Sequence, residues 1–333
     1  MTIDAVFKTR NLVAAVESMR PVPTPVLSKV FTTPIRSFSS NLEWDVEKDS
    51  EGICVSIPSG SPARMSSKDG YDHVVVAAPR FSEKFHVRPS DLDNIRRMGD
   101  NVAPMLLADL VGREQAKLRA KIDRTREFMA VKALSGTIVD GENKTLATFA
   151  LPSGHNPVLT STAKWSDSES DIVKNLRAWK KLISQAVGGA VSSFHSFCGS
   201  DVMDAVLNNA KIQELLKYTK GSQIAEQGTI AHLAGVDIEE LLGSYKTDAG
   251  VRTDLIASGY IALVGIGAGN AGEAFAPPED FEAADGIGSG KLPGVFFSKS
   301  WEEKDPSARW VKVEARPLPV ILRPGCIVYA KVL

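Results

Sequence analysis

Residues 113–139 read REQAKLRAKIDRTREFMAVKALSGTIV and contain most of the clearest helix signal in this 333-residue chain. The predicted helix runs from 102 to 135, and Gly136 can end it because glycine tolerates the left-handed backbone common after a helix. Its apolar side chains recur at helical spacing, at Leu107, Val111, Leu118, Ile122 and Met129. At about 1.5 Å per residue the helix would be roughly 50 Å long. Such a rod is more typical of a scaffold element than of a catalytic cleft.

A second face of this rod is basic, with cations spaced about one turn apart at Arg113, Lys117, Lys121 and Arg124. One interpretation is the solvated face of an amphipathic helix. The other is a non-specific contact with phosphate groups, which needs only spaced positive charge. Neither interpretation includes the reading of a base sequence.

N-terminal to the rod, residues 1–50 carry prolines at Pro21, Pro23, Pro25 and Pro34. Proline every few residues disfavours a long helix and a central strand. The spacing therefore predicts an extended arm that buries little of its own surface. We expect such an arm to lie on its own domain or on a neighbouring subunit.

Residues 51–86 predict two strands joined by a long polar tip. The β-branched runs lie at 53–57 and 73–76. The turn-forming residues between them are too many for a tight hairpin. Because a two-stranded finger is only marginally stable alone, we expect a partner surface to cover it.

C-terminal to the rod, the sequence predicts a strand at 137–139 and an amphipathic helix at 168–187. Gly188 and Gly189 end that helix and are the best candidates for a domain boundary. Further elements are predicted in this order: a strand at 193–198, a helix at 200–210, and closing strands at 317–320 and 326–332.

The composition bounds the class of protein. The chain has 39 Lys and Arg against 40 Asp and Glu, for a net charge of −1. This balance excludes a strongly basic nucleic-acid binder and an acidic disordered tail. Three scattered cysteines form no disulfide framework. With no signal-peptide pattern and no apolar run of about 20 residues, we expect a cytoplasmic chain without a membrane segment.

One glycine motif suggests a nucleotide site. Gly267, Gly269 and Gly272 follow an apolar strand-like run and match G-x-G-x-x-G, a fingerprint of dinucleotide binding. Pro277 and Pro278 would break the long helix that this fingerprint requires. We therefore favour a loop that turns the chain, and keep a dinucleotide-binding enzyme as the alternative function.

Other catalytic patterns fail. The segment 286–291 resembles a phosphate loop, but Asp285 and Leu292 stand where that motif needs Gly and Ser or Thr. The five histidines lack metal-ligand spacing, and no G-x-S-x-G elbow supplies a nucleophile. The sequence thus predicts no catalytic residue, no cofactor and no metal.

Several segments together resemble the major capsid proteins of tailed phages, in particular the lambda-type capsid E family. They are residues 124–139, Trp165 to Ile172, Phe197 to Asn209, Trp301 with Asp305-Pro306, and Ala315 to Pro319 followed by Pro324 and the strand 327–332. The chain has Pro324-Gly325-Cys326 where that family usually carries Pro-Asp.

This resemblance implies an α+β fold of the Hong Kong 97-like capsid type. Residues 1–50 would be its N-terminal arm and 51–86 its E-loop. Residues 87–189 would form the peripheral domain with the spine helix, and 190–310 the axial domain. Residues 311–333 would return as strands to the peripheral domain.

The function implied is that of a major capsid protein of a tailed double-stranded DNA phage or prophage, with no enzymatic activity. The chain would assemble in the host cytoplasm through hexamers and pentamers into the icosahedral shell of the virion. Its implied partners are itself, a separate scaffolding protein, the portal, a decoration protein and packaged double-stranded DNA, which it would contact non-specifically. A non-viral nanocompartment shell on the same fold stays an alternative.

The resemblance also implies roles for three groups of residues. The basic stripe of Arg113, Lys117, Lys121 and Arg124 would face interior DNA or scaffold. The E-loop would contact a neighbouring subunit through Arg64, Lys68, Asp69 and Tyr71, and Gly267, Gly269 and Gly272 would lie in a loop near a symmetry axis. Charge is segregated in the sequence, with a net +4 over 113–132 and −5 over 270–290.

Overall fold

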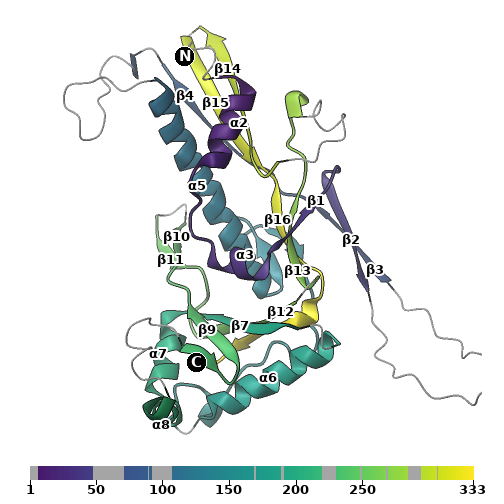
Figure 1. Cartoon of the computed structure of the whole chain (residues 1–333), viewed down its shortest axis with the longest axis vertical. Coiled ribbons are helices and arrows are strands. Elements are labelled where there is room, and N and C mark those ends of the chain that lie inside the picture. The colour runs from purple at the N-terminus through teal and green to yellow at the C-terminus, as the bar shows by residue number, and fades with distance from the viewer. Residues whose placement is uncertain are drawn as a thin grey trace, which may run out of the picture. The chain divides into compact units, whose positions relative to one another are not determined.

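Figure 1 shows the fold as given by a computed structural model of the chain. The residues that the structure describes are 7–47, 71–88, 90–91, 107–168, 170–188, 191–219, 230–247, 250–267, 269–283, 294–305 and 307–333. The strand predicted at 53–57 lies outside them.

The described part of the chain combines α-helices with mostly antiparallel sheets, which confirms the α+β class. The described α-helices are α2 (Thr9–Ser18), α3 (Pro25–Val30), α5 (Leu107–Leu134), α6 (Ile172–Ala186), α7 (Ser200–Asn208) and α8 (Ala210–Thr219). The first strands are β1 (Thr33–Arg36), β2 (Asn41–Glu47), β3 (Tyr71–Ala77), β4 (Phe81–Val87), β5 (Thr137–Val139), β6 (Thr145–Thr148), β7 (Ser193–Cys198), β8 (Ile230–Leu233) and β9 (Val236–Glu240). The later strands are β10 (Ser244–Lys246), β11 (Arg252–Asp254), β12 (Tyr260–Ile266), β13 (Ala271–Phe275), β14 (Phe297–Lys304), β15 (Ser307–Ala315), β16 (Pro317–Ile321) and β17 (Ile327–Lys331).

The predicted rod is helix α5, and its C-terminal end lies where the sequence places it. Gly136 follows the helix with φ of 86°, and a Cβ at this position would lie 2.8 Å from the carbonyl oxygen of Phe149. Only glycine fits that backbone and that close approach. Strand β5 begins directly afterwards, also as predicted.

The chain forms two compact units. Unit 1 contains Met1–Leu42, Ala77–Ala130 and Glu273–Pro319, and unit 2 contains Glu43–Val76, Val131–Gly272 and Val320–Leu333. These units are defined by contacts inside one chain, whereas the five expected segments are defined by their places in a shell. The five-segment division therefore stays a prediction.

Unit 1 packs part of helix α5 against an antiparallel sheet in the order β14-β15-β4. One core cluster joins Leu12 of α2 and Val111 of α5 to Val311 of β15. A second cluster joins Val16, Ile122 and Val313 in the same way. The apolar face predicted for the rod is thus the face that contacts the sheet and α2.

Unit 2 is built on a five-stranded sheet in the order β17-β12-β7-β9-β8, in which only the β7 and β9 pair is parallel. Strand β12 is almost wholly buried because α6 lies against it. A Cβ at Gly265 would lie 2.7 Å from Cγ2 of Ile183 in α6, so glycine permits this close packing. Strands β7, β16 and β17 confirm the predicted strands.

The N-terminal segment corrects one expectation, because it is not simply extended. Residues Thr9–Ser18 form α2 ahead of the prolines, where nothing breaks a helix. Pro25 lies in the first turn of α3, where its missing N–H costs nothing and its fixed φ favours the helix. The linker with Pro21 and Pro23 contains no helix, and the strands β1, with Pro34, and β2 are extended as predicted.

Candidate functional site: the two faces of helix α5

The predicted basic stripe lies on one exposed face of helix α5. Arg113, Lys117, Lys121 and Arg124 all have exposed side chains. Lys117 donates to Glu114 at 2.6 Å, and Lys121 pairs with Glu83 of β4. Nε of Arg124 donates to the carbonyl oxygen of Ala120 at 3.0 Å. The stripe can therefore present four cations, two of them partly neutralised by carboxylates of the same chain.

The opposite face of α5 carries a buried ionic cluster that sequence reasoning missed. Arg126 binds Glu273 of β13 through two hydrogen bonds, both of 2.7 Å, and donates to Asp123 at 2.8 Å. Nε of Arg119 lies 3.5 Å from the same Asp123 carboxylate. Burial would lower the pKa of Arg126, but the bond and charge of Glu273 raise it overall. The cluster fixes α5 to β13 within unit 1.

This cluster changes the meaning of the charge segregation. Arg119 and Arg126 contribute to the +4 of the rod, yet both are engaged on its buried side. Glu273 contributes to the −5 of residues 270–290, yet its carboxylate is bound to Arg126. The two opposite charges are thus partly paired with each other inside unit 1, and the exposed segregation is smaller than the sequence suggests.

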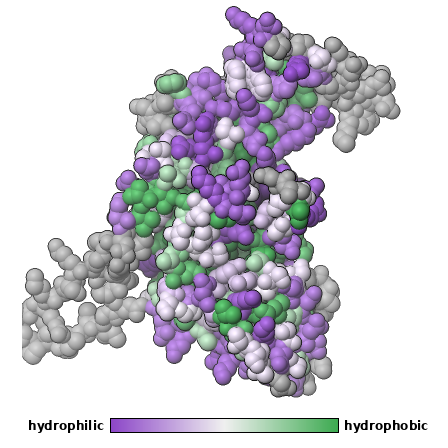
Figure 2. Space-filling view, turned by 180° about the vertical axis from the view of Figure 1, so that it is seen from behind, coloured by the Kyte–Doolittle hydropathy of each residue, from purple (hydrophilic) through white to green (hydrophobic). Residues whose placement is uncertain are grey.

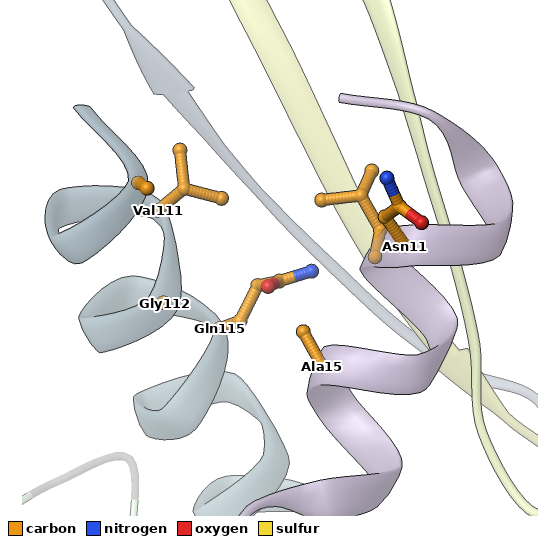
Figure 3. Close-up of a pocket in the computed structure, with 7 residues that line it drawn as sticks. Asn11, Ala15, Val111, Gly112 and Gln115 are labelled. Carbon is orange, nitrogen blue, oxygen red and sulfur yellow. The ribbon is translucent and has the colours of Figure 1, made fainter. Parts of the chain in front are cut away.

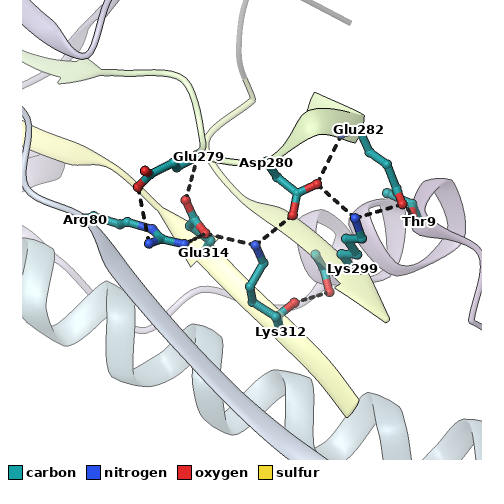
Figure 4. Close-up of polar contacts among 9 residues, drawn as sticks. Thr9, Arg80, Glu279, Asp280, Glu282, Lys299, Lys312 and Glu314 are labelled. Atoms are coloured by element: carbon teal, nitrogen blue, oxygen red, sulfur yellow. Dashed lines mark hydrogen bonds and ion pairs between the residues drawn. The ribbon is translucent and has the colours of Figure 1, made fainter. Parts of the chain in front are cut away.

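A second ionic network, shown in Figure 4, joins four segments of unit 1. Arg80 donates to the fully buried Glu314 at 3.0 Å, and Lys312 lies 3.2 Å from the same carboxylate. Lys312 and Lys299 donate to the two oxygens of Asp280 at 2.9 and 3.1 Å. Lys299 also pairs with Glu282, which accepts a 2.6 Å bond from Thr9 of α2.

The acids of this network are held in their ionised form. Burial would raise the pKa of Asp280, but hydrogen bonds from Lys312 and Lys299 lower it overall. Burial would also raise the pKa of Glu314, but the bonds from Arg80 and from the amide of Glu279, together with Lys312, lower it overall. The bond from Thr9, followed by the bond from Lys299, lowers the pKa of Glu282. The network thus behaves as a structural clamp, with each charge already paired.

An aromatic surface on the sheet of unit 1 is another feature that sequence reasoning missed. Trp301 of β14 stacks on Trp310 of β15, with ring centroids 6.2 Å apart and an interplanar angle of 9°. Nζ of Lys84 lies 4.5 Å from the Trp310 ring. The sequence signal for this surface was a tryptophan on each side of Asp305-Pro306. Trp301 remains 37% exposed, so part of its surface is open to solvent.

Exposed apolar side chains are otherwise scattered. Among the described residues, the large ones are Phe38, Val75, Val158, Leu242, Val251, Phe281 and Trp301. On the face shown in Figure 2, hydrophobic residues lie in separate patches between hydrophilic ones. Such isolated positions are ordinary on protein surfaces.

Most of the residues predicted to form E-loop contacts lie outside the residues that the structure describes. Arg64, Lys68 and Asp69 lie outside the described residues, and Tyr71 is the first residue of β3. Within the described part of the chain, β3 pairs with β2 in a two-stranded sheet. The intersubunit role of these residues stays a prediction.

The glycine motif does not have the geometry of a dinucleotide site. Strand β12 is followed by a turn in which Gly269 has φ of 80°, and then by strand β13. A pyrophosphate site of this type needs a helix N-terminus at that point. The structure therefore contradicts the dinucleotide alternative. Gly272 lies inside the buried strand β13, so it is not a loop residue, and the expected symmetry-axis position of Gly267 and Gly269 stays a prediction.

Two further observations concern the described residues only. No helix among them combines the length and the apolar character needed to cross a membrane. Nor do their His, Cys, Asp and Glu side chains form a group of three or more that could hold a metal ion.

Comparison with solved structures relates this fold to capsid subunits. A prophage protein of E. coli CFT073 described as a capsid protein is similar with a TM-score of 0.65 and 16% identity, over 98% of this chain and 99% of that chain. The mature capsid of bacteriophage PhiM1 gives a TM-score of 0.56 and 12% identity, over 94% and 88%. The capsid of a native GTA particle gives 0.56 and 12%, over 95% and 93%. At these identities the likeness concerns the fold, which is of the expected Hong Kong 97-like type.

The sequence comparison is more specific. No curated protein sequence shows significant similarity to the chain. A family model described as phage major capsid protein E matches residues 8–332, from the N-terminal arm to the final strand. That family is a phage family, which favours a viral shell over a nanocompartment. On its fold and on a sequence match along nearly its whole length, the chain belongs to the phage major capsid protein E family.

Proposed function

We propose that this chain is the head-shell subunit of a tailed double-stranded DNA phage or prophage. In this role it assembles with copies of itself, through hexamers and pentamers, into the icosahedral shell around the genome. The observation that carries the proposal is the family match from residue 8 to residue 332. Closed symmetry then builds a large particle from one sequence by repeating the same contacts.

The proposed role is structural and not enzymatic. The ionic groups of unit 1 support this view, because they join elements of the chain to one another. Arg126 fixes α5 to β13, and Asp280 joins β14 and β15 to the segment that follows β13. Paired charges of this kind stabilise a subunit and are poorly suited to exchange protons with a substrate.

We also propose partners beyond the chain itself. A separate scaffolding protein directs assembly in the host cytoplasm, a portal occupies one vertex, and a decoration protein is a further candidate partner. The E-loop residues Arg64, Lys68, Asp69 and Tyr71 contact a neighbouring subunit, and Gly267 and Gly269 lie near a symmetry axis. The family membership supports each of these proposals.

The exposed face of α5 is the proposed contact for packaged DNA or for an acidic scaffold. Its support is the exposure of all four cations on one side of a single helix. Such contacts are electrostatic, so they weaken as the salt concentration rises. Arg113 and Arg124 are the cations of the stripe that form no ion pair with another described residue, and we expect them to contribute most.

The test of this contact is replacement of Arg113, Lys117, Lys121 and Arg124 by Gln. The control replaces Lys174, Arg177 and Lys181, three exposed cations of α6. We expect the stripe variant to give far fewer DNA-filled particles than the control when both are produced with the phage's other head proteins. An equal yield of filled particles from both variants would refute the contact and leave the shell role intact.

A further inference from the structure

Helix α5 provides hydrogen-bond partners for the ends of two short helices in the N-terminal segment. We call residues 8–31, which contain α2 and α3, the docked arm. Helix α2 has ten residues and α3 has six, whereas isolated helices shorter than about 12–15 residues are marginal in water. The N-cap residues, Lys8 and Thr24, provide no side-chain hydrogen bond to either helix. Stability must therefore come from outside the arm.

Arg119 of α5 donates hydrogen bonds at the C-terminal end of α2. Its NH1 nitrogen donates toward the carbonyl oxygens of Val16, Glu17 and Met19, the second at 3.2 Å. The last carbonyls of a helix have no partner within the helix. All three contacts are made by NH1, which carries two hydrogens, so at least one N–H is shared between two carbonyl oxygens.

Glu127 of α5 accepts hydrogen bonds at the N-terminal end of α3. One carboxylate oxygen accepts from the amide of Val26 at 2.8 Å and the other from the amide of Leu27 at 3.1 Å. Pro25 has no N–H, and the amide of Ser28 donates to the carbonyl of Thr24 at 2.9 Å. Glu127 thus satisfies both amides of the first turn that would otherwise lack a partner.

The apolar contact between arm and rod is incomplete. Figure 3 shows a cavity between α2 and α5, with a volume of about 160 Å³ and a lining that includes Asn11, Ala15, Val111, Gly112 and Gln115. A Cβ on Gly112 would meet no atom within 4 Å. No side chain from Glu17 to Thr24 is buried. Elsewhere the arm is packed, with Leu12 and Val16 in core clusters shared with α5 and Thr9 bound to Glu282, so the contacts of Arg119 and Glu127 add to an existing interface.

We propose that Arg119 and Glu127 form a two-point latch that keeps the docked arm folded on α5. The two residues lie about two turns apart on the rod, one at each arm helix. When the latch opens, the docked arm leaves α5 and loses both helices, while the β14-β15-β4 sheet keeps its structure. This inference concerns the single subunit and stands whether or not the chain forms a shell.

The test is hydrogen–deuterium exchange of the full-length chain, read by mass spectrometry on peptides from residues 8–31 and on reference peptides from β15. The latch variants are Arg119→Met and Glu127→Gln. The matched controls are Arg113→Met and Glu114→Gln, on the exposed side of the same helix. We expect roughly tenfold faster exchange of the arm in each latch variant, as for a lost helix cap, and no change in β15.

Unchanged exchange of the arm in both latch variants would overturn the proposal. So would a simultaneous loss of protection in the arm and in β15, because it would mean that the arm does not open separately. If a variant fails to fold, the wild-type chain in low urea decides the question. We then expect the amides of the docked arm to lose their protection from exchange at a lower urea concentration than the amides of β15. Loss of protection at the same urea concentration in both segments would refute the latch.

Discussion

Gly112 and Gly136 belong to the same stretch of chain, but substitution should affect them in opposite directions. Gly112 lies inside α5 beside open space, and alanine there would favour the helix by about 1 kcal/mol. Gly136 has a left-handed backbone, and a Cβ would approach the Phe149 carbonyl to 2.8 Å. We expect Gly112→Ala to raise Tm and Gly136→Ala to lower it. Calorimetry of both variants checks this, and a lower Tm for Gly112→Ala would contradict the description of the cavity.

Individual residues also show what periodicity can and cannot predict. The spacing of Arg113, Lys117, Lys121 and Arg124 was enough to place all four on one exposed face. Arg119 and Arg126 have the same chemistry on the same helix, yet they are engaged on its buried side. Their partners, Glu273 and the carbonyls of α2, lie more than 100 residues away in sequence. Helical spacing puts Arg119 and Arg126 on the other side of α5 from the stripe, but only the tertiary fold reveals these distant partners.

At the scale of elements, the Arg126–Glu273 pair should be a major support of the contact between α5 and β13. Breaking a buried ion pair by removing one partner typically costs about 3–5 kcal/mol. We expect Glu273→Gln to lower the free energy of unfolding by roughly 3 kcal/mol. The exposed Glu114–Lys117 pair provides the control, since Glu114→Gln should cost less than about 0.5 kcal/mol. Urea unfolding of both variants measures these free energies. An equally small loss of stability in both variants would show that the buried pair is not a major support of the contact.

The network around Asp280 predicts a dependence of stability on pH. The pKa values of Asp280, Glu282 and Glu314 are lowered, so their contribution is complete above the ordinary carboxyl pKa of about 4 and is lost as the pH falls through the lowered values. The pKa of Lys299 is raised, first by the bond to Glu282, so its contribution is lost only as the pH rises through that raised value. We expect the contribution of this network to stay constant between about pH 6 and 9 and to decline below about pH 4.5.

The variant Asp280→Asn isolates this effect. It removes the carboxylate that both Lys299 and Lys312 bind, so its urea midpoint should fall less steeply between pH 5 and 3 than that of the wild type. An identical pH slope in both proteins would show that other groups govern the acid response.

The elements themselves were predicted unevenly. The rod, the strands β5 and β7 and the closing strands follow from local periodicity and from glycine, and the structure confirms them. The helices α2 and α3 were missed because proline was weighed against the whole segment, although Pro25 is compatible with a first turn. Their ends rest on Arg119 and Glu127, which local sequence cannot connect to them.

At the scale of the whole molecule, the resemblance in sequence gave the capsid family and the α+β fold, and the comparisons confirm both. Surfaces that join one subunit to the next could not be derived from periodicity, because a side chain exposed in the single chain has the same pattern whether or not a neighbour covers it. Trp301 and Phe281 are examples of such exposed side chains.

As a phage major capsid protein, this chain should build a closed shell. The most direct test is electron microscopy of the purified protein, alone and together with its scaffolding protein, over a range of salt concentrations. We expect rings, tubes or closed shells made of hexamers and pentamers. A chain that stays strictly monomeric under every one of these conditions would contradict this expectation.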